Sequence, residues 1–206
     1  MDAIGREDID AISPYQDQIE AIILPKTQSF DFLATLAPMI DFSNKLVPLI
    51  ETPRAIDTVT QIAAFKDVVG LFFGAADSSA SLGCKLAWEP LLYARQKVVL
   101  AAAMYNLFTI DAPFFYIDDK EGLKKEAEAV KNLGFTGKAA IHPDQIDFIN
   151  ESFAPTSEEI AEGKKVLEEY QKSGGGAVKI DGQMVDEPIA EAMRLKISLG
   201  EDEIED

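Results

Sequence analysis

Residues 46–53 of this chain read Leu46-Val47-Pro48-Leu49-Ile50-Glu51-Thr52-Pro53. Five apolar residues in a row predict a strand that is buried on both faces, as in a parallel sheet covered by helices. The carboxylate and the proline that close the run predict that the strand ends there and that a helix begins at Pro53. Ile56, Val59 and Ile62 then recur at helical spacing, which is typical of a helix packed against a sheet.

The same pattern recurs before and after this stretch. Further short apolar runs lie at residues 21–24, 68–73, 107–110 and 137–141, with helical patterns between them at 90–105 and 121–133. The runs begin roughly 30 residues apart, which is the length of one unit in a (β/α)8 barrel. No glycine-rich phosphate loop follows any of them, which favours a barrel over a doubly wound sheet. We therefore expect an α/β fold of the (β/α)8 TIM-barrel type, N-terminally truncated to about five of the eight units.

The pattern changes after residue 153, so we expect a partial barrel at 1–153 and a C-terminal lid segment at 154–206. Thr156 and Glu159 have the spacing of a capping box, which predicts the start of a long helix. A glycine joint at 174–176 follows this helix, and Asp181-Gly182 between apolar-rich arms predicts a β-hairpin. A last helix over 188–199 completes a helix–hairpin–helix lid, and the acidic residues 200–206 are expected to form a solvated end.

The composition argues against several classes of protein. The 206 residues carry 36 Asp and Glu against 19 Lys and Arg, a formal charge of −17, and no basic cluster offers a face for nucleic acid. No apolar run approaches the roughly 18 residues of a membrane span, and we see no signal-peptide pattern at the N-terminus. Cys84 is the only cysteine, which fits a reducing, cytoplasmic location. With no base recognisable nearby, Cys84 is interpreted as a small packed residue and not as a nucleophile.

Two carboxylates follow consecutive predicted strands. Glu51 comes directly after the strand that ends at Ile50, and Asp77 follows the next strand in Gly74-Ala75-Ala76-Asp77. Adjacent parallel strands lie about 4.8 Å apart, so both carboxylates are expected at one mouth of the fold, where water and a keto acid would complete a Mg²⁺ site. The small residues Gly74, Ala75 and Ala76 would let backbone N–H groups approach a substrate carboxylate. The alternative is that Glu51 caps the helix that begins at Pro53 and Asp77 caps a following turn.

Five motifs occur in the order seen in one known family. They are Ile23-Leu24-Pro25-Lys26, Leu49-Ile50-Glu51-Thr52, Phe73-Gly74-Ala75-Ala76-Asp77, the stretch 134–143 ending in Ile141-His142-Pro143, and Asp181-Gly182-Gln183-Met184-Val185-Asp186. Together they resemble the citrate lyase β-subunit-like (CitE-like) branch of the HpcH/HpaI aldolase superfamily. The resemblance implies a TIM-barrel lyase that cleaves or forms a carbon–carbon bond in acyl-CoA thioesters such as malyl-CoA, citramalyl-CoA or citryl thioesters. It also implies a homotrimer.

The resemblance assigns roles to particular residues. Glu51 and Asp77 match the family's Mg²⁺ ligands, and Asp186 matches an acid/base on the lid that enters the site of a neighbouring subunit. The alternative for Asp186 is a cap for the helix near Pro188. His142 matches a segment that borders the coenzyme A channel, or is a structural loop residue.

Two lysines complete the candidate site. Lys26 follows a strand at the mouth and is expected to face the keto acid, while Lys138 is expected to meet a phosphate of coenzyme A or to lie in a solvated turn.

The family's first three βα units and its substrate-binding arginine are not found in this sequence. Three hypotheses follow from that departure. The chain is a Mg²⁺-dependent acyl-CoA lyase, a catalytically impaired subunit that binds a CoA ester or a partner chain, or a CoA-independent aldolase of 4-hydroxy-2-keto acids. The lid hairpin and Asp186 favour the thioester chemistry over the last of these.

Overall fold

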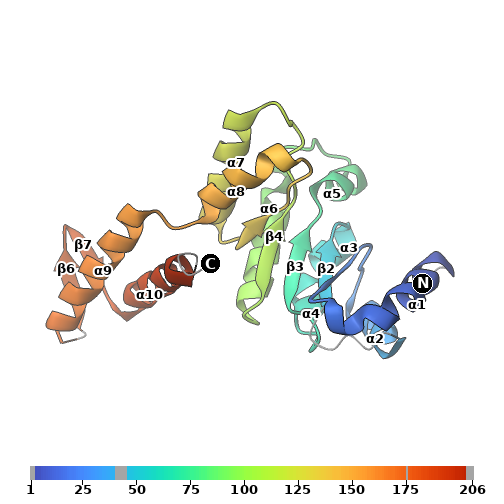
Figure 1. The fold of residues 1–206 in the computed structure, drawn as a ribbon, viewed down its shortest axis with the longest axis horizontal. Helices are drawn as coiled ribbons and strands as arrows, with labels where there is room; N and C mark the ends of the chain where they lie inside the picture. Colours follow the sequence, from blue (N-terminus) through green and yellow to red (C-terminus); the bar gives the residue numbers. More distant parts are fainter. Residues whose placement is uncertain (1–2, 40–45, 175, 203–206) are drawn as a thin grey trace. The chain divides into compact units, whose positions relative to one another are not determined.

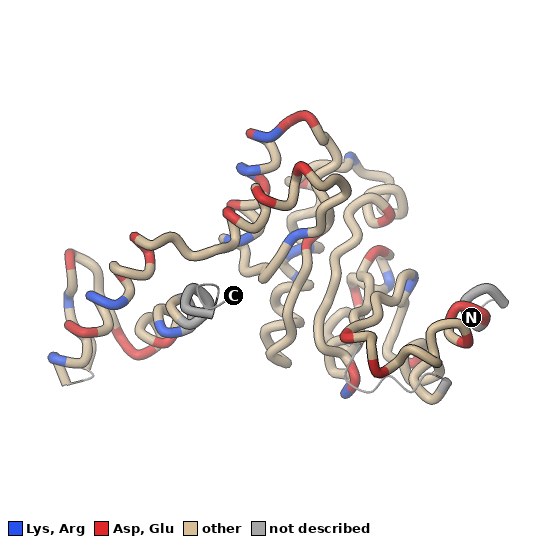
Figure 2. Tube along the Cα trace, in the orientation of Figure 1, with Lys and Arg blue, Asp and Glu red and all other residues tan. Residues whose placement is uncertain are grey.

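The computed structural model describes residues 3–39, 46–174 and 176–202. The chain divides into two compact units, Met1–Ile149 and Asn150–Asp206. The predicted boundary, between residues 153 and 154, falls at the end of helix α8 (Ile146–Phe153), four residues after this division. Figure 1 shows the course of the chain through both units, and Figure 2 shows that Asp and Glu residues are distributed along both.

The first unit alternates strands and helices. Its elements in chain order are α1 (Ala3–Ile12), η1 (Ser13–Gln18), β1 (Ile22–Leu24), α2 (Phe30–Leu36), η2 (Ala37–Met39), β2 (Leu46–Ile50), α3 (Pro53–Asp57), α4 (Val59–Ala63), β3 (Gly70–Phe73), α5 (Ala75–Leu82), α6 (Trp88–Ala103), β4 (Phe108–Asp111), α7 (Lys120–Leu133), β5 (Gly137–Lys138), η3 (Pro143–Gln145) and the start of α8 (Ile146–Phe153).

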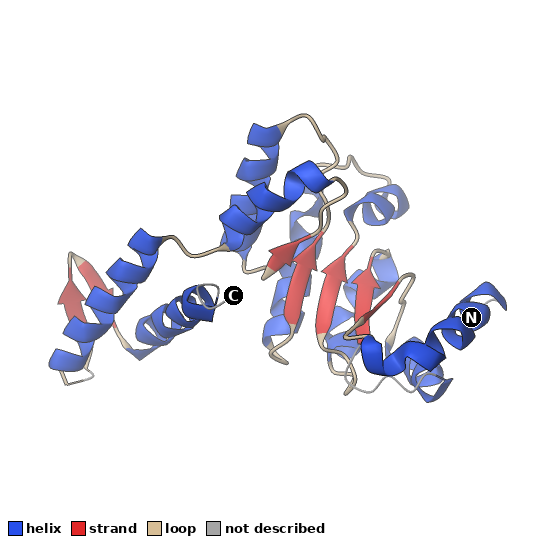
Figure 3. Ribbon diagram, in the orientation of Figure 1, coloured by secondary structure: helices blue, strands red, loops and turns tan. Residues whose placement is uncertain are grey.

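All five strands of this unit join one parallel sheet. The order among the described residues is β1-β2-β3-β4-β5, with each strand paired to the next one along the chain (Figure 3). Parallel neighbours need a crossover, and the intervening helices supply it. The expected α/β class and the approximate positions of all five strands are therefore confirmed, and the described strands form an open parallel sheet. No barrel closure is seen among the described strands.

The core of the first unit lies between the sheet and its helices. Leu71 and Phe73 of β3 share one face of the sheet and are fully buried, as is Val98 of α6, which packs on β3 and β4. Phe72 points to the opposite face, because side chains alternate along a strand, and it is only partly buried, like Ile110 of β4. One face of the sheet is thus the better covered.

Several boundaries differ by a few residues from those predicted, and two of the differences change how the elements are read. The helix that begins at Pro53 breaks at Thr58, whose backbone leaves the helical conformation (φ −98°, ψ 13°), so that α3 and α4 are separate. Strand β5 ends at Lys138 and not at Ile141, because the Ile141 amide donates to the side chain of Gln145 and turns the chain into η3.

The second unit contains α9 (Ser157–Lys172), β6 (Val178–Ile180), β7 (Gln183–Val185) and α10 (Glu187–Asp202). The capping box is present, with reciprocal bonds of 2.9 and 3.1 Å between Thr156 and Glu159. Asp181 and Gly182 both have positive φ, at 47° and 90°, which is the geometry of a tight hairpin turn. Of the predicted glycine joint, Gly175 lies outside the described residues. So do residues 203–206 of the expected solvated end, whereas residues 200–202 continue α10.

A small apolar core holds this second unit together. Its buried members come from α9, the hairpin and α10: Val166, Tyr170, Ile180, Val185 and Ala190. In the described parts of the chain no helix has the length and apolarity needed to cross a membrane.

Candidate metal and substrate site

Glu51 lies at the carboxyl end of β2, where the chain leaves the sheet for α3. Only 3% of the residue is exposed. Its Oε1 accepts a 2.7 Å hydrogen bond from the backbone N–H of Lys26. The cap of α3 is provided by the neighbouring Thr52, whose hydroxyl accepts from the Ala55 amide, so Glu51 is not needed as a cap. Its buried carboxylate is therefore available to a ligand at the edge of the sheet.

Asp77 lies in the first turn of α5, which starts directly after β3. The residue between strand and helix, Gly74, stands against Glu51: a Cβ on Gly74 would lie 2.6 Å from the Cβ of Glu51. Real side chains do not approach so closely, and glycine is what allows the ends of β2 and β3 to meet here. The sequence Gly74-Ala75-Ala76-Asp77 thus brings the second carboxylate to the first.

Lys26 lies between the two carboxylates. Its Nζ is 2.5 Å from Asp77 Oδ1 and 3.5 Å from Glu51 Oε1, which keeps the two oxygens within roughly 6 Å of each other. The hydrogen bond to Asp77 is the main reason why the pKa of Lys26 is raised above its usual value. Lys26 also adopts a left-handed backbone conformation, φ 56°, which is uncommon for a residue other than glycine. Its amide bond to Glu51 helps to hold that conformation.

The donor set suits a hard divalent cation. Two carboxylates already face one positive charge, and Mg²⁺ is commonly held by one or two carboxylates, with water and ligand oxygens in the remaining positions. The described residues contain no group of three or more His, Cys, Asp or Glu side chains arranged for a metal. A cation at Glu51 and Asp77 would therefore need oxygens from water or substrate, and would displace the Lys26 ammonium.

The backbone N–H groups expected to face a substrate divide into two kinds. The amide of Gly74 donates to the carbonyl of Ile50 at 3.0 Å and belongs to the sheet. The amides of Ala75 and Ala76 lie in the first turn of α5, where N–H groups have no partner within the helix. Of the three small residues, Ala75 and Ala76 thus retain the geometry for binding a carboxylate.

Lys138 does not have the surroundings expected of a phosphate-binding residue. Its side chain is fully buried, and its Nζ donates to Asp111 at 2.9 Å, to the carbonyl of Ala112 at 2.7 Å and to Glu126 at 2.7 Å. All three ammonium hydrogens are thus used. A solvated turn is also wrong for this residue, because its role is to join β4, β5 and α7 from within.

The two remaining predicted residues, His142 and Asp186, each accept a backbone hydrogen bond at the start of a helix. The His142 Nδ1 accepts from the Asp144 amide at 3.2 Å and begins η3, which supports the structural alternative for His142. The Asp186 Oδ1 accepts from the Ile189 amide at 3.4 Å at the start of α10. This capping bond uses Oδ1 of Asp186 and does not involve Oδ2. Cys84 is a partly buried free thiol.

A buried ionic cluster was not predicted. Arg95 of α6 binds Asp111 at 2.8 Å, and Asp111 in turn binds Lys138, with both Arg95 and Asp111 almost wholly inaccessible. The sequence contained two signals: Arg95 interrupts the apolar face of α6, and Asp111 directly follows the apolar run at residues 107–110. A charge at a core position of a helix requires a buried partner.

The chain matches the HpcH/HpaI aldolase/citrate lyase family over residues 3–143. It belongs to that family. The chain is 30% identical to the citrate lyase subunit beta of Haemophilus influenzae, across 91% of this chain and 70% of that protein. It is 29% identical to the human mitochondrial citramalyl-CoA lyase, across 95% of this chain and 64% of that protein.

A solved structure is similar in fold to this chain. CitE of Mycobacterium tuberculosis, in complex with magnesium, acetoacetate and coenzyme A, superposes with a TM-score of 0.83 at 28% identity, covering 97% of this chain and 74% of that one. The chain spans between 47% and 70% of the length of the curated relatives with which it was compared.

Proposed function

We propose that this chain is a Mg²⁺-dependent carbon–carbon lyase that acts on CoA thioesters of hydroxy acids, of the malyl-CoA, citramalyl-CoA or citryl thioester class. The observation that carries the proposal is that the carboxylates of Glu51 and Asp77 both contact the Lys26 ammonium at the carboxyl edge of the sheet. In parallel α/β folds this edge is where ligands bind. Membership of the aldolase/citrate lyase family supports this chemistry over other uses of the same geometry.

In the proposed reaction the bond between C2 and C3 of a 3-hydroxyacyl thioester breaks. The hydroxyl proton is removed, the C–O bond becomes a carbonyl, and the electron pair of the broken bond passes to the thioester as an enolate. The enolate takes up a proton at C2 and leaves as the shortened acyl thioester, alongside a 2-oxo acid. A cation held by Glu51 and Asp77 would supply the Lewis acid for the oxygens of that acid.

The chain's own residues orient the substrate and move the proton. The amides of Ala75 and Ala76 point from the start of α5, where a carboxylate is favoured by unpaired N–H groups. Lys26, once displaced from the carboxylates, has the length and exposure to pair with the same acid group. Asp186 is proposed as the acid/base, carried on the second unit so that it enters a site only when substrate is bound.

Assembly forms part of this proposal. We propose that the five-stranded sheet is part of a (β/α)8 barrel and that the protein works as a trimer, with Asp186 of one subunit serving the site of another. An Asp186→Asn variant should lose turnover while still binding Mg²⁺. Mixing it with a Glu51→Gln variant should restore some activity, because mixed oligomers contain sites with both groups intact. No rescue in oligomers shown to be mixed would overturn the cross-subunit role.

The proposal is tested by magnesium calorimetry together with turnover of malyl-CoA and citramalyl-CoA. Glu51→Gln and Asp77→Asn should each weaken Mg²⁺ binding by roughly 100-fold and abolish turnover. Asp57→Asn is the matched control, since its side chain is 85% exposed on α3 and outside the site. Retained Mg²⁺ binding in both site variants would refute the metal site. Metal and CoA-ester binding without turnover would identify an impaired subunit, and cleavage of a 4-hydroxy-2-keto acid alone would identify an aldolase.

A further inference from the structure

The guanidinium of Arg95 is fixed on three sides. Its Nε donates to Asp111 Oδ1 at 2.8 Å, with a longer 3.5 Å contact from Nη2 to the other carboxylate oxygen. The ring of Phe73 lies 5.2 Å from the guanidinium carbon and the ring of Trp88 lies 4.8 Å from it. Ion pairing along one edge and aromatic stacking together hold the plane of the group in one orientation.

The remaining edge of this guanidinium has no partner. In the described part of the chain, Arg95 Nη1 is one of two buried side-chain atoms without a hydrogen bond, although only 3% of the residue is exposed. Buried donors are rarely left in this state, and each such donor calls for an explanation. Because Asp111 and the two rings fix the plane, the arginine cannot turn to satisfy Nη1 from within the protein.

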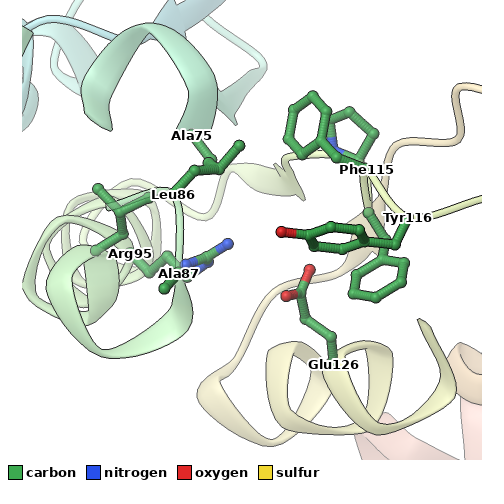
Figure 4. Close-up of a pocket in the computed structure, with 10 residues that line it drawn as sticks. Ala75, Leu86, Ala87, Arg95, Phe115, Tyr116 and Glu126 are labelled. Carbon is green, nitrogen blue, oxygen red and sulfur yellow. The ribbon is translucent and has the colours of Figure 1, made fainter. Parts of the chain in front are cut away.

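Arg95 lines a pocket of the first unit, and Figure 4 shows its guanidinium directed toward that pocket. The pocket has a volume of about 40 Å³ and lies between α6, the loop after β4 and α7 (Figure 4). Its walls are largely apolar, with Leu86, Leu91 and Phe114 among them. A buried water occupies roughly 10–15 Å³ by this measure, so the volume corresponds to about three waters or to the carbon, oxygen and nitrogen of one amide group.

Two other polar groups face the same space. Figure 4 shows the Tyr116 hydroxyl pointing into the pocket and the Glu126 carboxylate directed toward it from α7. Tyr116 is 67% exposed, so its ring stands at the mouth, whereas Glu126 is anchored by its 2.7 Å bond to Lys138. The pocket therefore presents a fixed donor at Arg95 and a fixed acceptor at Glu126.

The charges around the pocket select a neutral ligand. Arg95 and Lys138 carry two positive charges, and Asp111 and Glu126 carry two negative charges, so the cluster is balanced without a ligand. An anion bound to Arg95 would approach the Glu126 carboxylate, and a cation would approach Arg95, each at a cost in a partly buried site. A neutral group that accepts a hydrogen bond from Arg95 and donates one to Glu126 binds both residues without adding a charge.

We infer that this pocket is a binding subsite for a secondary amide, whose carbonyl accepts from Arg95 Nη1 and whose N–H donates to Glu126, with the flanking carbons against the apolar walls. The site is separate from the Glu51/Asp77 pair. The two adjoin through Ala75, which lines the pocket and lies two residues before Asp77. Two sources share this chemistry, a free small amide and the pantetheine arm of a coenzyme A thioester; the second rests on the proposed function.

The test is an NMR titration of the full chain, in the absence of Mg²⁺, following the backbone amides of Leu86, Ala87 and Arg95, which line or border the pocket and have no part in the proposed carboxylate site. The probes are N-methylacetamide, pantetheine, and acetate as the anionic comparison. N-methylacetamide should give saturable shifts in the millimolar range, with acetate at least tenfold weaker. Tighter binding of pantetheine would assign the pocket to the thioester arm, and equal binding would assign it to free amides.

Matched variants show whether the pocket is the place of binding. Leu86→Trp places a large ring at the rim and should weaken amide binding at least tenfold. Leu82→Trp is the control, since Leu82 is similarly exposed, at 48% against 41%, and does not line the pocket. Three results would each overturn the inference: no saturable shift, which indicates a pocket holding only water; acetate binding as tightly as the amide; or equal binding in Leu86→Trp and the parent chain. None of these readouts depends on the metal or on turnover.

Discussion

Two lysines of this chain, Lys26 and Lys138, each lie between two carboxylates, yet they belong to different kinds of region. The side chain of Lys26 is 62% exposed and reaches Glu51 and Asp77 at the edge of the sheet. The side chain of Lys138 is fully buried against Asp111 and Glu126. An exposed ammonium is screened by water and exchanges readily with another cation, whereas a buried one cannot leave without exposing unpaired charge.

The comparison explains why only one of these clusters is proposed as a metal site. At the edge of the sheet, Lys26 neutralises the carboxylates of Glu51 and Asp77, and another cation could replace its ammonium there. In the interior, three hydrogen bonds from one ammonium join two strands and a helix. The same three residue types therefore give a replaceable counter-ion in one place and a structural tie in the other, and burial is the variable that separates them.

The largest expected effect is on stability. Lys138→Met leaves Asp111 and Glu126 without their shared cation in the interior, and should lower the free energy of unfolding by about 3–5 kcal/mol. Lys26→Met should move the transition far less, because water already screens the exposed carboxylate. Denaturant unfolding followed by the fluorescence of Trp88, the only tryptophan and part of α6, measures both. Equal shifts for the two variants would remove the distinction between the clusters.

A second prediction concerns the glycine that lets the two strand ends meet. Gly74→Ala places a Cβ 2.6 Å from the Cβ of Glu51, and should lower the free energy of unfolding by about 1–3 kcal/mol. It should also weaken Mg²⁺ binding in calorimetry, because the displaced group is the buried carboxylate. Gly137→Ala is the control, since the nearest atom to its Cβ would be a carbonyl oxygen at 4.0 Å. Unchanged Mg²⁺ affinity in Gly74→Ala would show that the close approach does not serve the site.

The sequence predicted the parallel sheet and the meeting of two carboxylates because both depend on local patterns. A buried strand is a run of apolar residues, and the residue that follows it lies at the carboxyl edge by construction. The role of Lys138 depends on distant residues instead: its partners Asp111 and Glu126 are 27 and 12 residues away. A lysine beside Gly137 has the local pattern of a solvated turn, and only the packing of α7 over the sheet reveals otherwise.

The pocket beside Arg95 was hidden for the same reason. Its walls come from α5, α6, the loop after β4 and α7, and no single stretch carries its pattern. The break of the predicted helix at Thr58 is a different case, because it rests on the backbone conformation of one residue (φ −98°, ψ 13°), which helical periodicity does not report.

A third prediction tests whether Lys26 competes with the metal. If the ammonium stands where a cation binds, Lys26→Met should tighten Mg²⁺ binding by roughly three- to tenfold, since one positive charge no longer opposes the ion. Lys66→Met is the control, as Lys66 is 82% exposed and pairs only at 3.9 Å with Asp67. Calorimetry at low ionic strength gives the largest difference, which added salt should reduce. Weaker Mg²⁺ binding in Lys26→Met would mean that the lysine assists the site and does not compete for it.

The smallest expected effect extends the comparison to the second unit, where Arg194 also lies between two carboxylates, Glu187 at 2.8 Å and Glu191 at 2.5 Å. All three side chains are substantially exposed, so this cluster should behave like the one at Lys26. The hydrogen bond from Arg194, followed by that from Tyr170, holds the pKa of Glu187 below its ordinary value of 4.5. A lowered carboxyl pKa stabilises the folded state above pH 4.5, and that contribution is lost as the pH falls through the folded-state pKa.

Arg194→Met should therefore raise the pKa of Glu187 toward its ordinary value, and any stability difference between variant and parent should shrink as the pH falls below about 4.5. Side-chain NMR titration measures the shift. Glu168 is the internal control, because its pKa is lowered by Lys172 on α9 and should not respond to a change on α10. High salt should bring the Glu187 titrations of parent and variant together, as expected for exposed charges. If neither the substitution nor added salt changes the pKa of Glu187, the Arg194 cluster resembles the one at Lys138 and not the one at Lys26. Exposure would then no longer be what separates the two kinds of region.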